Sequence, residues 1–388
     1  FPDPSITQPN IRFQQTRTMP NEVQRTDSMP VKYHKQEDGT FRSVVDEKVG
    51  KAKSWTMDRL SSRENPLVIF TLSTQAVIGA FLMTFLGPLL GIDALSAVKE
   101  SAAYFPMLVS LIVIQAGVLV LSTLHLGKPL RFYRGFNNLR YSPLSREALG
   151  IAMFFAGLAG YTVFEALNVW LDLWVLDIAA IAAGGFATIS ALVGLYFMHC
   201  IYRIQARPFW NHWQVLTSFF GTMFSVGGIL LGLFVITSMA IQGQDYSGLV
   251  SLLGGLVAVG LIAEAIGLVF HARYLDTENG EGAAAHYIQS TTFGKTYLLR
   301  NGLIGLGIVA SLAVAAFAPA GWFVMTLVLL VALTVVAALL AGRALFYVLV
   351  IPTTMPGAFF WKNKGFEQHA RDIGLANMPQ VGVVPEMH

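Results

Sequence analysis

The sequence predicts an all-α integral membrane protein in which eight transmembrane helices form a bundle and both termini are cytoplasmic. Hydrophobic residues make up 54% of the 388 positions and charged residues only 13%, whereas soluble domains carry about 25% charged residues. Eight apolar stretches have about the 20 residues needed to cross the hydrocarbon core. Backbone polar groups inside a bilayer must find partners within their own segment, so each stretch is expected to be a helix.

The expected spans lie between residues 66 and 351, which we treat as the membrane domain. They are Pro66–Leu90, Phe105–Leu124, Ala148–Leu171, Leu173–Met198, Trp213–Ala240, Ser247–Phe270, Asn301–Ala318 and Gly321–Ile351. The last is longer than a bilayer needs, so it should tilt or emerge. Gly228 and Gly232 have the small-xxx-small spacing of a helix-packing face, and ordinary helix–helix packing is the role we expect of them.

Positive charge predicts the orientation of the bundle. Of the 26 Lys and Arg residues, 25 fall in residues 1–65, in the connections after the second, fourth and sixth spans, or in the segment from residue 342 onward. Only Lys99 falls on the other side. Because loops rich in Lys and Arg stay in the cytoplasm, both termini and these three connections are expected there. The expected location is a bacterial or archaeal cytoplasmic membrane.

The two terminal segments are predicted to be arms. Residues 1–65 are polar with charges of both signs, which is typical of an extended cytoplasmic arm and not of a domain. Within them, residues 44–62 fit either a short interfacial amphipathic helix or an irregular linker. Residues 352–388 contain four prolines and predict a second arm on the cytoplasmic face or on a partner. The sequence starts at Phe1 without a signal-peptide pattern, so we expect it to be processed or to be the later part of a longer product.

Cysteine and histidine usage limits the redox chemistry of the protein itself. Cys200 is the single cysteine, which excludes an internal disulfide, a CxxC site and a Cys-ligated iron–sulfur cluster. A pair of b-haems across the bilayer needs histidines at both depths. None of the eight histidines falls on the far side, although the count leaves room for one haem near the cytoplasmic face.

The connection between the second and third spans, residues 123–150, concentrates polar groups beside the membrane. His125 ends a span, and Gly127 and Pro129 stop the helix after it. A neutral imidazole there can exchange a proton with a quinone, or it can cap carbonyl groups at the helix end. Arg131 and the neighbouring basic and aromatic residues fit a pocket wall, a docking surface or simple positive-inside charge. Glu147 fits either a helix-dipole partner, with Ser142 or Ser145 as N-cap, or a site carboxylate.

Further polar residues fall inside the spans. Glu264 lies seven residues before His271, so two helical turns place both on one face. This pair fits a proton relay, and an interhelical hydrogen bond is the structural alternative. Arg343, near Tyr347 at the end of the eighth span, is suited to anchoring at the interface, to binding a quinone or to contacting a neighbouring subunit. Glu165 and Asp177 lie near far-side span ends and can reach water.

Three ordered motifs give the sequence a resemblance to a known family. They are an HLG-x-P motif at His125–Pro129, an L-S-x-E motif at Leu144–Glu147 and a G-R-x-x-F-Y motif at Gly342–Tyr347. Residues 66–350 thereby resemble the membrane anchor subunit of DMSO-reductase-type molybdoenzymes, the DmsC type, which is distantly related to the NrfD and polysulfide reductase anchors. The first 30 residues resemble instead the tail of the ferredoxin-like iron–sulfur subunit, which suggests a fused cluster–anchor polypeptide.

The resemblance implies a three-subunit complex. A catalytic subunit would hold molybdopterin, a ferredoxin-like subunit would hold four iron–sulfur clusters, and the anchor would bind menaquinone or ubiquinone without haem. The family's quinone-site histidine carries over to His125. The predicted quinone site comprises His125, Gly127, Arg131, Glu147, Arg343 and Tyr347, with no catalytic or metal-ligating residue in this protein. Electrons would pass between the docked iron–sulfur protein and the quinone pool during sulfite oxidation or DMSO, polysulfide or thiosulfate reduction.

Two other classes compete with this interpretation. Eight spans and the intramembrane Glu264 also permit a secondary transporter, which predicts an inverted repeat and interrupted helices at the bilayer midplane. The sequence has no evident repeat, and its polar residues crowd one side. A purely structural anchor would bind no quinone and would tolerate the loss of His125.

Overall fold

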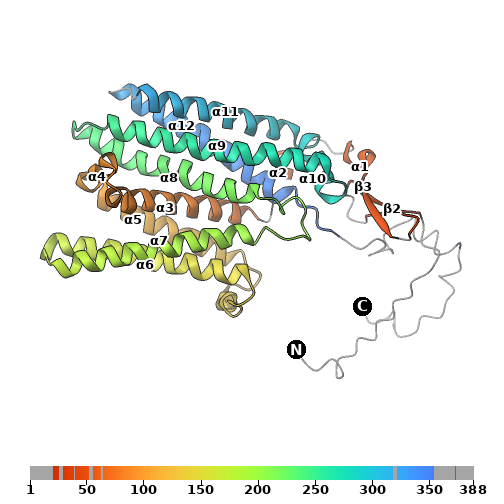
Figure 1. Cartoon of the computed structure of the whole chain (residues 1–388), viewed down its shortest axis with the longest axis horizontal. Helices are drawn as coiled ribbons and strands as arrows, with labels where there is room; N and C mark the ends of the chain where they lie inside the picture. The colour runs from red at the N-terminus through yellow and green to blue at the C-terminus, as the bar shows by residue number, and fades with distance from the viewer. Residues whose placement is uncertain are drawn as a thin grey trace, which may run out of the picture.

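The computed structural model describes residues 21–25, 29–38, 40–51, 56–62, 64–317, 321–353 and 372. Within these residues, eight helices are long and apolar enough to cross a membrane. They run side by side along the long axis of the molecule (Figure 1). The fold class predicted from the sequence, an all-α bundle of eight spans, is therefore confirmed.

The membrane helices end within two turns of their expected bounds. They are α3 Asn65–Leu89, α5 Tyr104–Leu124, α6 Pro143–Leu171, α7 Trp174–Cys200, α8 Gln214–Ile241, α9 Ser247–Thr277, α11 Gly294–Phe317 and α12 Trp322–Val348. Three of them, α6, α9 and α11, extend beyond the expected bounds by more than one turn, always at the same end of the bundle. Each extension continues past a buried polar residue, namely Glu147, His271 or Arg300.

The two ends of the bundle differ in structure. The basic end carries the connections rich in Lys and Arg, including the 3-10 helix η1 (Pro129–Phe136) and α10 (Glu281–Ser290). The far end carries α4 (Asp93–Glu100) and short turns, so α4 and α10 lie at opposite ends in Figure 1. At the far end, Lys99 Nζ lies 2.8 Å from a carboxylate oxygen of Glu165. Glu165 thus pairs with the one basic residue of that side.

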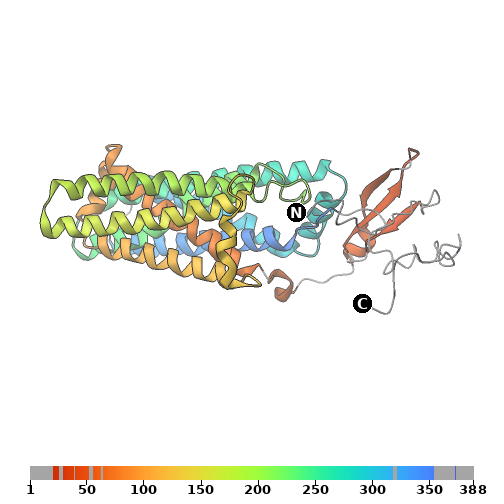
Figure 2. The same cartoon turned by 90° about the horizontal axis from the view of Figure 1, so that it is seen from below.

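The N-terminal arm differs from the extended segment expected from its polarity. A three-stranded antiparallel sheet is formed by β1 (Glu22–Gln24), β2 (Val31–Lys35) and β3 (Phe41–Val45). In place of one helix over residues 44–62, the structure has α1 (Glu47–Lys51) and α2 (Met57–Leu60), while residues 52–55 lie outside the described ones. The sheet lies beyond the basic end (Figure 2).

The sheet is held to the bundle by a second hydrophobic core. Val23, Val31 and Tyr33 pack with apolar residues of α10 and of the end of α12. The Tyr33 hydroxyl donates to a carboxylate oxygen of Glu281 at 2.7 Å, and burial followed by this carboxylate raises the pKa of Tyr33. Local polarity predicted an arm because the apolar partners of these strands in the bundle come from residues more than 170 positions later. Most of residues 352–388 lie outside the described residues.

The closest helix crossing involves glycines other than the pair expected from the sequence. A Cβ atom added to Gly79 of α3 would lie 1.9 Å from the backbone oxygen of Met223 in α8. Gly227 faces Gly79 with a similar lack of space, since a Cβ added to Gly227 would lie 2.6 Å from the Gly79 Cα. A Cβ on Gly228 would make an ordinary 3.4 Å contact with Val257. Gly228 therefore packs as expected of a helix face, but the backbones approach most closely one residue earlier.

Each of the eight spans is one continuous helix over the described residues. A transporter with interrupted helices at the midplane would have broken segments among them. The largest groups of buried charged side chains gather instead toward the basic end, as described next.

Candidate functional site

Buried polar side chains from four helices gather toward the basic end of the bundle. Glu147 of α6, Glu264 and His271 of α9, Arg300 of α11 and Arg343 of α12 are each no more than 6% exposed. Charges buried in a membrane protein are costly unless they are paired, and such residues mark functional positions. Their convergence makes this region the candidate site.

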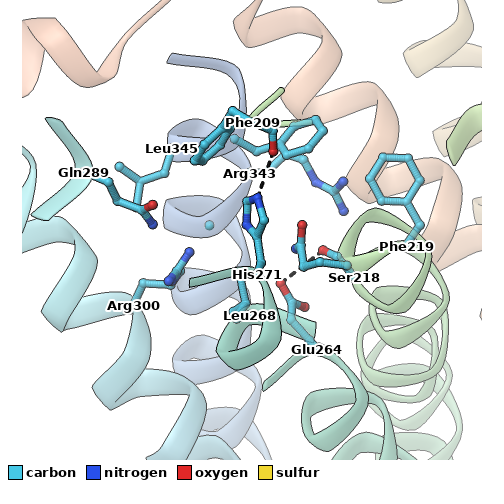
Figure 3. Close-up of a pocket in the computed structure, with 13 residues that line it drawn as sticks. Phe209, Ser218, Phe219, Glu264, Leu268, His271, Gln289, Arg300, Arg343 and Leu345 are labelled. Atoms are coloured by element: carbon cyan, nitrogen blue, oxygen red, sulfur yellow. Dashed lines mark hydrogen bonds between the residues drawn. The ribbon is translucent and has the colours of Figure 1, made fainter. Parts of the chain in front are cut away.

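A cavity of about 30 Å³ lies between α8, α9, α11 and α12 (Figure 3). Its polar lining includes Glu264, His271, Arg300 and Arg343, which approach it from different sides. A space of this size holds two or three waters, given that one water needs about 10–15 Å³ on the same measure. The cavity in this form is therefore too small for a quinone ring and is suited to water.

Glu264 is incompletely paired within this cavity. One carboxylate oxygen accepts a hydrogen bond from Ser218 Oγ at 3.1 Å, while the other is buried without a protein partner. Among the described residues, neither Arg300 nor Arg343 forms an ion pair with it within 4.0 Å. An unpaired buried carboxylate oxygen costs free energy, and a bridging water satisfies it.

Arg343 connects the cavity to α3 and α8. Its Nη2 donates to Gln75 Oε1 at 3.0 Å and to Thr222 Oγ1 at 3.5 Å. The guanidinium also packs over the Phe219 ring, with Cζ 4.2 Å from the ring centroid. Arg343 is 4% exposed, so it is an interior residue and not the interfacial anchor that its position near a helix end also allowed.

Tyr347 meets a tyrosine from a distant part of the sequence. Its hydroxyl lies 2.6 Å from the Tyr202 hydroxyl. Trp210 closes over this pair, stacking on Phe346 and donating from Nε1 to the Phe346 backbone oxygen at 2.7 Å. Burial raises the pKa of Tyr202, followed by the influence of Tyr347 and of the Glu147 charge, while Arg343 lowers it.

Glu147 lies in the first turns of α6, and its neighbours fix that helix start. Ser142 is the N-cap, and its Oγ accepts a hydrogen bond from the Ser145 backbone N–H at 3.3 Å. Arg146 donates to the backbone oxygens of Leu139 and Arg140. These bonds tie the basic loop to α6 directly beside Glu147, a structural role that the charge pattern alone did not indicate.

His125, Gly127 and Arg131 lie in that loop, apart from the buried group. His125 is half-buried at the end of α5, whereas Gly127 and Arg131 are exposed. His125 Nδ1 lies 2.7 Å from the Ser122 backbone oxygen. Because a carbonyl only accepts, Nδ1 carries the proton, and Nε2 of the neutral ring is an acceptor. The ring caps a helix-end carbonyl and still presents one nitrogen to a second partner.

The structure thus brings together part of the predicted set. Glu264, His271 and Arg343 line one cavity, while Tyr347 pairs with Tyr202 and Glu147 is buried in the first turns of α6. Sequence reasoning missed the partners that complete this arrangement, which are Gln75, Tyr202, Ser218, Thr222 and Arg300. Of these, only Arg300 carried a signal, as a charge at the start of an expected span.

Comparison with known families matches residues 60–349 to the description "DMSO reductase anchor subunit (DmsC)". Among curated proteins, the C subunit of the anaerobic dimethyl sulfoxide reductase of Haemophilus influenzae is 28% identical over 53% of this protein and 69% of its own length. The YnfH subunit of an Escherichia coli anaerobic dimethyl sulfoxide reductase is 26% identical over 51% of this protein and 67% of its own length. The C subunit of the Escherichia coli anaerobic dimethyl sulfoxide reductase is 29% identical over 46% of this protein and 60% of its own length.

Proposed function

Since the chain belongs to the DMSO reductase anchor subunit (DmsC) family, a family of membrane anchors of molybdopterin oxidoreductases, we propose that it is the quinone-binding subunit of a cytoplasm-facing enzyme. Family membership implies association with a catalytic and an iron–sulfur subunit and interaction with quinone in general. We propose further that electrons pass between a docked four-cluster iron–sulfur subunit and menaquinone or ubiquinone, while molybdopterin stays in the catalytic subunit.

The observation that carries the quinone site is the burial of polar residues from two distant sequence motifs at the same end of the bundle. Glu147 comes from the motif that opens α6, and Arg343 and Tyr347 come from the motif that ends α12, and all three are buried toward the basic end, where the Tyr347 hydroxyl lies 2.6 Å from that of Tyr202. Buried carboxyl and phenol groups beside the membrane interface are suited to hydrogen bonding and proton exchange with a quinone headgroup. The loop bearing His125, Gly127 and Arg131 is tied to the same helix start.

Within this proposal, His125 and Glu147 have complementary roles. His125 Nε2 is the acceptor nitrogen of a ring that Ser122 holds in one tautomer, so it can take a proton from a quinol hydroxyl. The Glu147 carboxyl is the buried proton-exchanging group, and it belongs to α6, the helix that follows the loop. Arg131 would contact either the docked iron–sulfur subunit or the quinone headgroup. The substrate half-reaction would be sulfite oxidation, which reduces quinone, or reduction of DMSO, polysulfide or thiosulfate, which oxidises quinol.

Replacing His125 with leucine tests the quinone site. Loss of a proton acceptor is expected to lower quinone-linked turnover of the assembled complex by about 100-fold, as for other general bases. The matched control is His199→Leu, because His199 Nδ1 makes the same contact with a carbonyl three residues earlier, at 2.5 Å from the Tyr196 oxygen. The control should retain turnover within about threefold. Wild-type turnover in an intact His125→Leu complex would refute the site.

The proposed orientation has a separate test. In a Cys200→Ser background, a cysteine at exposed Gln244, on the far end, is expected to react with a membrane-impermeant maleimide in intact spheroplasts. A cysteine at exposed Lys128, on the basic end, should react only after lysis. The opposite pattern would place the basic end outside the cytoplasm, against the positive-inside rule.

A further inference from the structure

The connection between α5 and α6 carries an exposed surface that the proposed quinone site does not use. It contains η1, which contacts the ends of α5 and α6 and has no buried residue. Leu130 is 91% exposed, and Phe132 and Tyr133 are each more than half exposed. Apolar side chains gathered in this way on one short segment mark a surface that binds a partner or a membrane.

The period of η1 separates its charged side chains from its apolar ones. A 3-10 helix has three residues per turn, so side chains three positions apart lie in one row. Arg131 and Arg134 share such a row, and Lys128 precedes it by three positions. Leu130 and Tyr133 share the neighbouring row. The segment is therefore amphipathic, with a cationic edge beside an apolar edge.

The cationic edge has no partner within the described part of the chain. Lys128, Arg131 and Arg134 are exposed, and none of them makes a hydrogen bond, an ion pair or a ring contact with a described residue. Residues 123–146 contain no Asp or Glu that could neutralise them. Because the three cations are unpaired and adjacent, the charge of this surface is complementary to an anionic partner.

The apolar edge continues the outer face of α5. Val113, Val120 and Leu124 are each more than half exposed, and spacings of seven and four residues place them on one helix face. Leu126 and Leu130 are exposed directly after this helix ends. The outer face of a membrane span contacts lipid, which a soluble protein does not reach. An apolar surface that continues this face is therefore suited to the bilayer.

η1 lies across the direction of the spans. Figure 2 shows the orange-to-yellow segment that joins α5 to α6 running across the ends of these helices, while the sheet lies farther out. Because the spans follow the bundle axis, a segment across this axis lies in the plane of the membrane surface. Amphipathic helices that bind membranes adopt this orientation, with their apolar side at the boundary between headgroups and acyl chains.

We propose that η1 and the residue before it form an interfacial anchor that binds anionic phospholipids at the basic end of the bundle. Lys128 and Arg134 contact lipid phosphate groups, while Leu130 and Phe132 enter the boundary between headgroups and acyl chains. The long cationic side chains extend their charged heads toward the phosphates. This inference goes beyond the proposed function, because it needs neither quinone nor a partner subunit. Arg131 keeps the role given above.

The first test measures lipid bound to the full-length protein. In maltoside micelles titrated with phosphatidylglycerol, native mass spectrometry gives the dissociation constant of the first bound lipid. Lys128→Gln combined with Arg134→Gln is expected to weaken this binding about 30-fold, since each Lys or Arg at an anionic surface contributes about fivefold. Phosphatidylcholine should bind both proteins equally weakly. Competition by inorganic phosphate at the lipid concentration would contradict a lipid site.

The matched control removes two cations elsewhere on the same end. Arg273 and Lys295 are exposed and lie outside η1, at the ends of α9 and α11. Arg273→Gln combined with Lys295→Gln lowers the net charge equally and should change phosphatidylglycerol binding by no more than about threefold. An equal loss in the two double variants would mean that net charge alone attracts the lipid, and the proposed anchor would be wrong.

The second test locates η1 relative to the bilayer and separates lipid from protein. A nitroxide on Phe132→Cys, in the Cys200→Ser background and in vesicles containing phosphatidylglycerol, should be relaxed more strongly by oxygen than by a water-soluble nickel chelate. Glu37→Cys, in the exposed turn between β2 and β3, is the control and should give the opposite ratio. In the assembled complex, continued access of oxygen to position 132 supports the anchor. Loss of access for both reagents would mean that a docked subunit covers η1, and a water-like ratio at position 132 would equally overturn the proposal.

Discussion

Replacing Arg343 with methionine is expected to destabilise the folded protein by about 3–5 kcal/mol, because it removes two buried hydrogen bonds from a charged donor, each worth about 1.5–3 kcal/mol. The variant loses the hydrogen bonds to Gln75 and Thr222 and the packing on Phe219. It also leaves Glu264 with one fewer compensating cation. The free energy of unfolding in mixed micelles titrated with a denaturing detergent measures the loss.

Two further variants separate the causes of this loss. Arg273→Met removes an arginine of α9 that lies outside the buried group and should change stability by no more than about 0.5 kcal/mol, as is usual for surface positions. The double variant Arg343→Met with Glu264→Gln should be less destabilised than the sum of its single changes, because the carboxylate no longer lacks its cation. Strict additivity would mean that the two side chains do not interact.

Replacing Gly79 with alanine is expected to cost about 3 kcal/mol, the upper part of the range for overpacked interiors. The added Cβ would lie 1.9 Å from the Met223 backbone oxygen. A backbone atom cannot move aside alone, so α3 and α8 must separate along their contact. The unfolding free energy in the same detergent titration, and the yield of inserted protein, report this change.

The controls for Gly79 are glycines with space around them. Gly228→Ala makes only an ordinary 3.4 Å contact, and Gly185→Ala meets nothing within 4 Å. Both should be neutral or slightly stabilising, since alanine is the better helix former by about 1 kcal/mol. A cost at Gly228 equal to that at Gly79 would mean that the small-residue spacing in the sequence, not the backbone approach, identifies the crossing.

Hydropathy located the spans but shortened three of those that enter the site. Expected bounds stopped at Ala148, Phe270 and Asn301, directly beside Glu147, His271 and Arg300. A hydropathy search adds up transfer free energies along one segment, so an expected span ends where a polar residue occurs. These three polar side chains are nevertheless buried, because other helices cover them. The residues that ended the expected spans are those that line the candidate site.

The sequence by itself determined the bundle, the basic side and the motifs or spacings that contain Glu147, Glu264, Arg343 and Tyr347. These follow from short-range properties, namely apolar length, charge per connection and helical spacing. Only the tertiary structure decided that Tyr202 meets Tyr347, that Gly79 faces Met223 and that β1, β2 and β3 form a sheet. Each of these depends on partners brought together from distant positions, and no local pattern carries that information. The polar side chains lie close together because the helices that carry them pack against one another, and this packing depends on residues throughout the sequence.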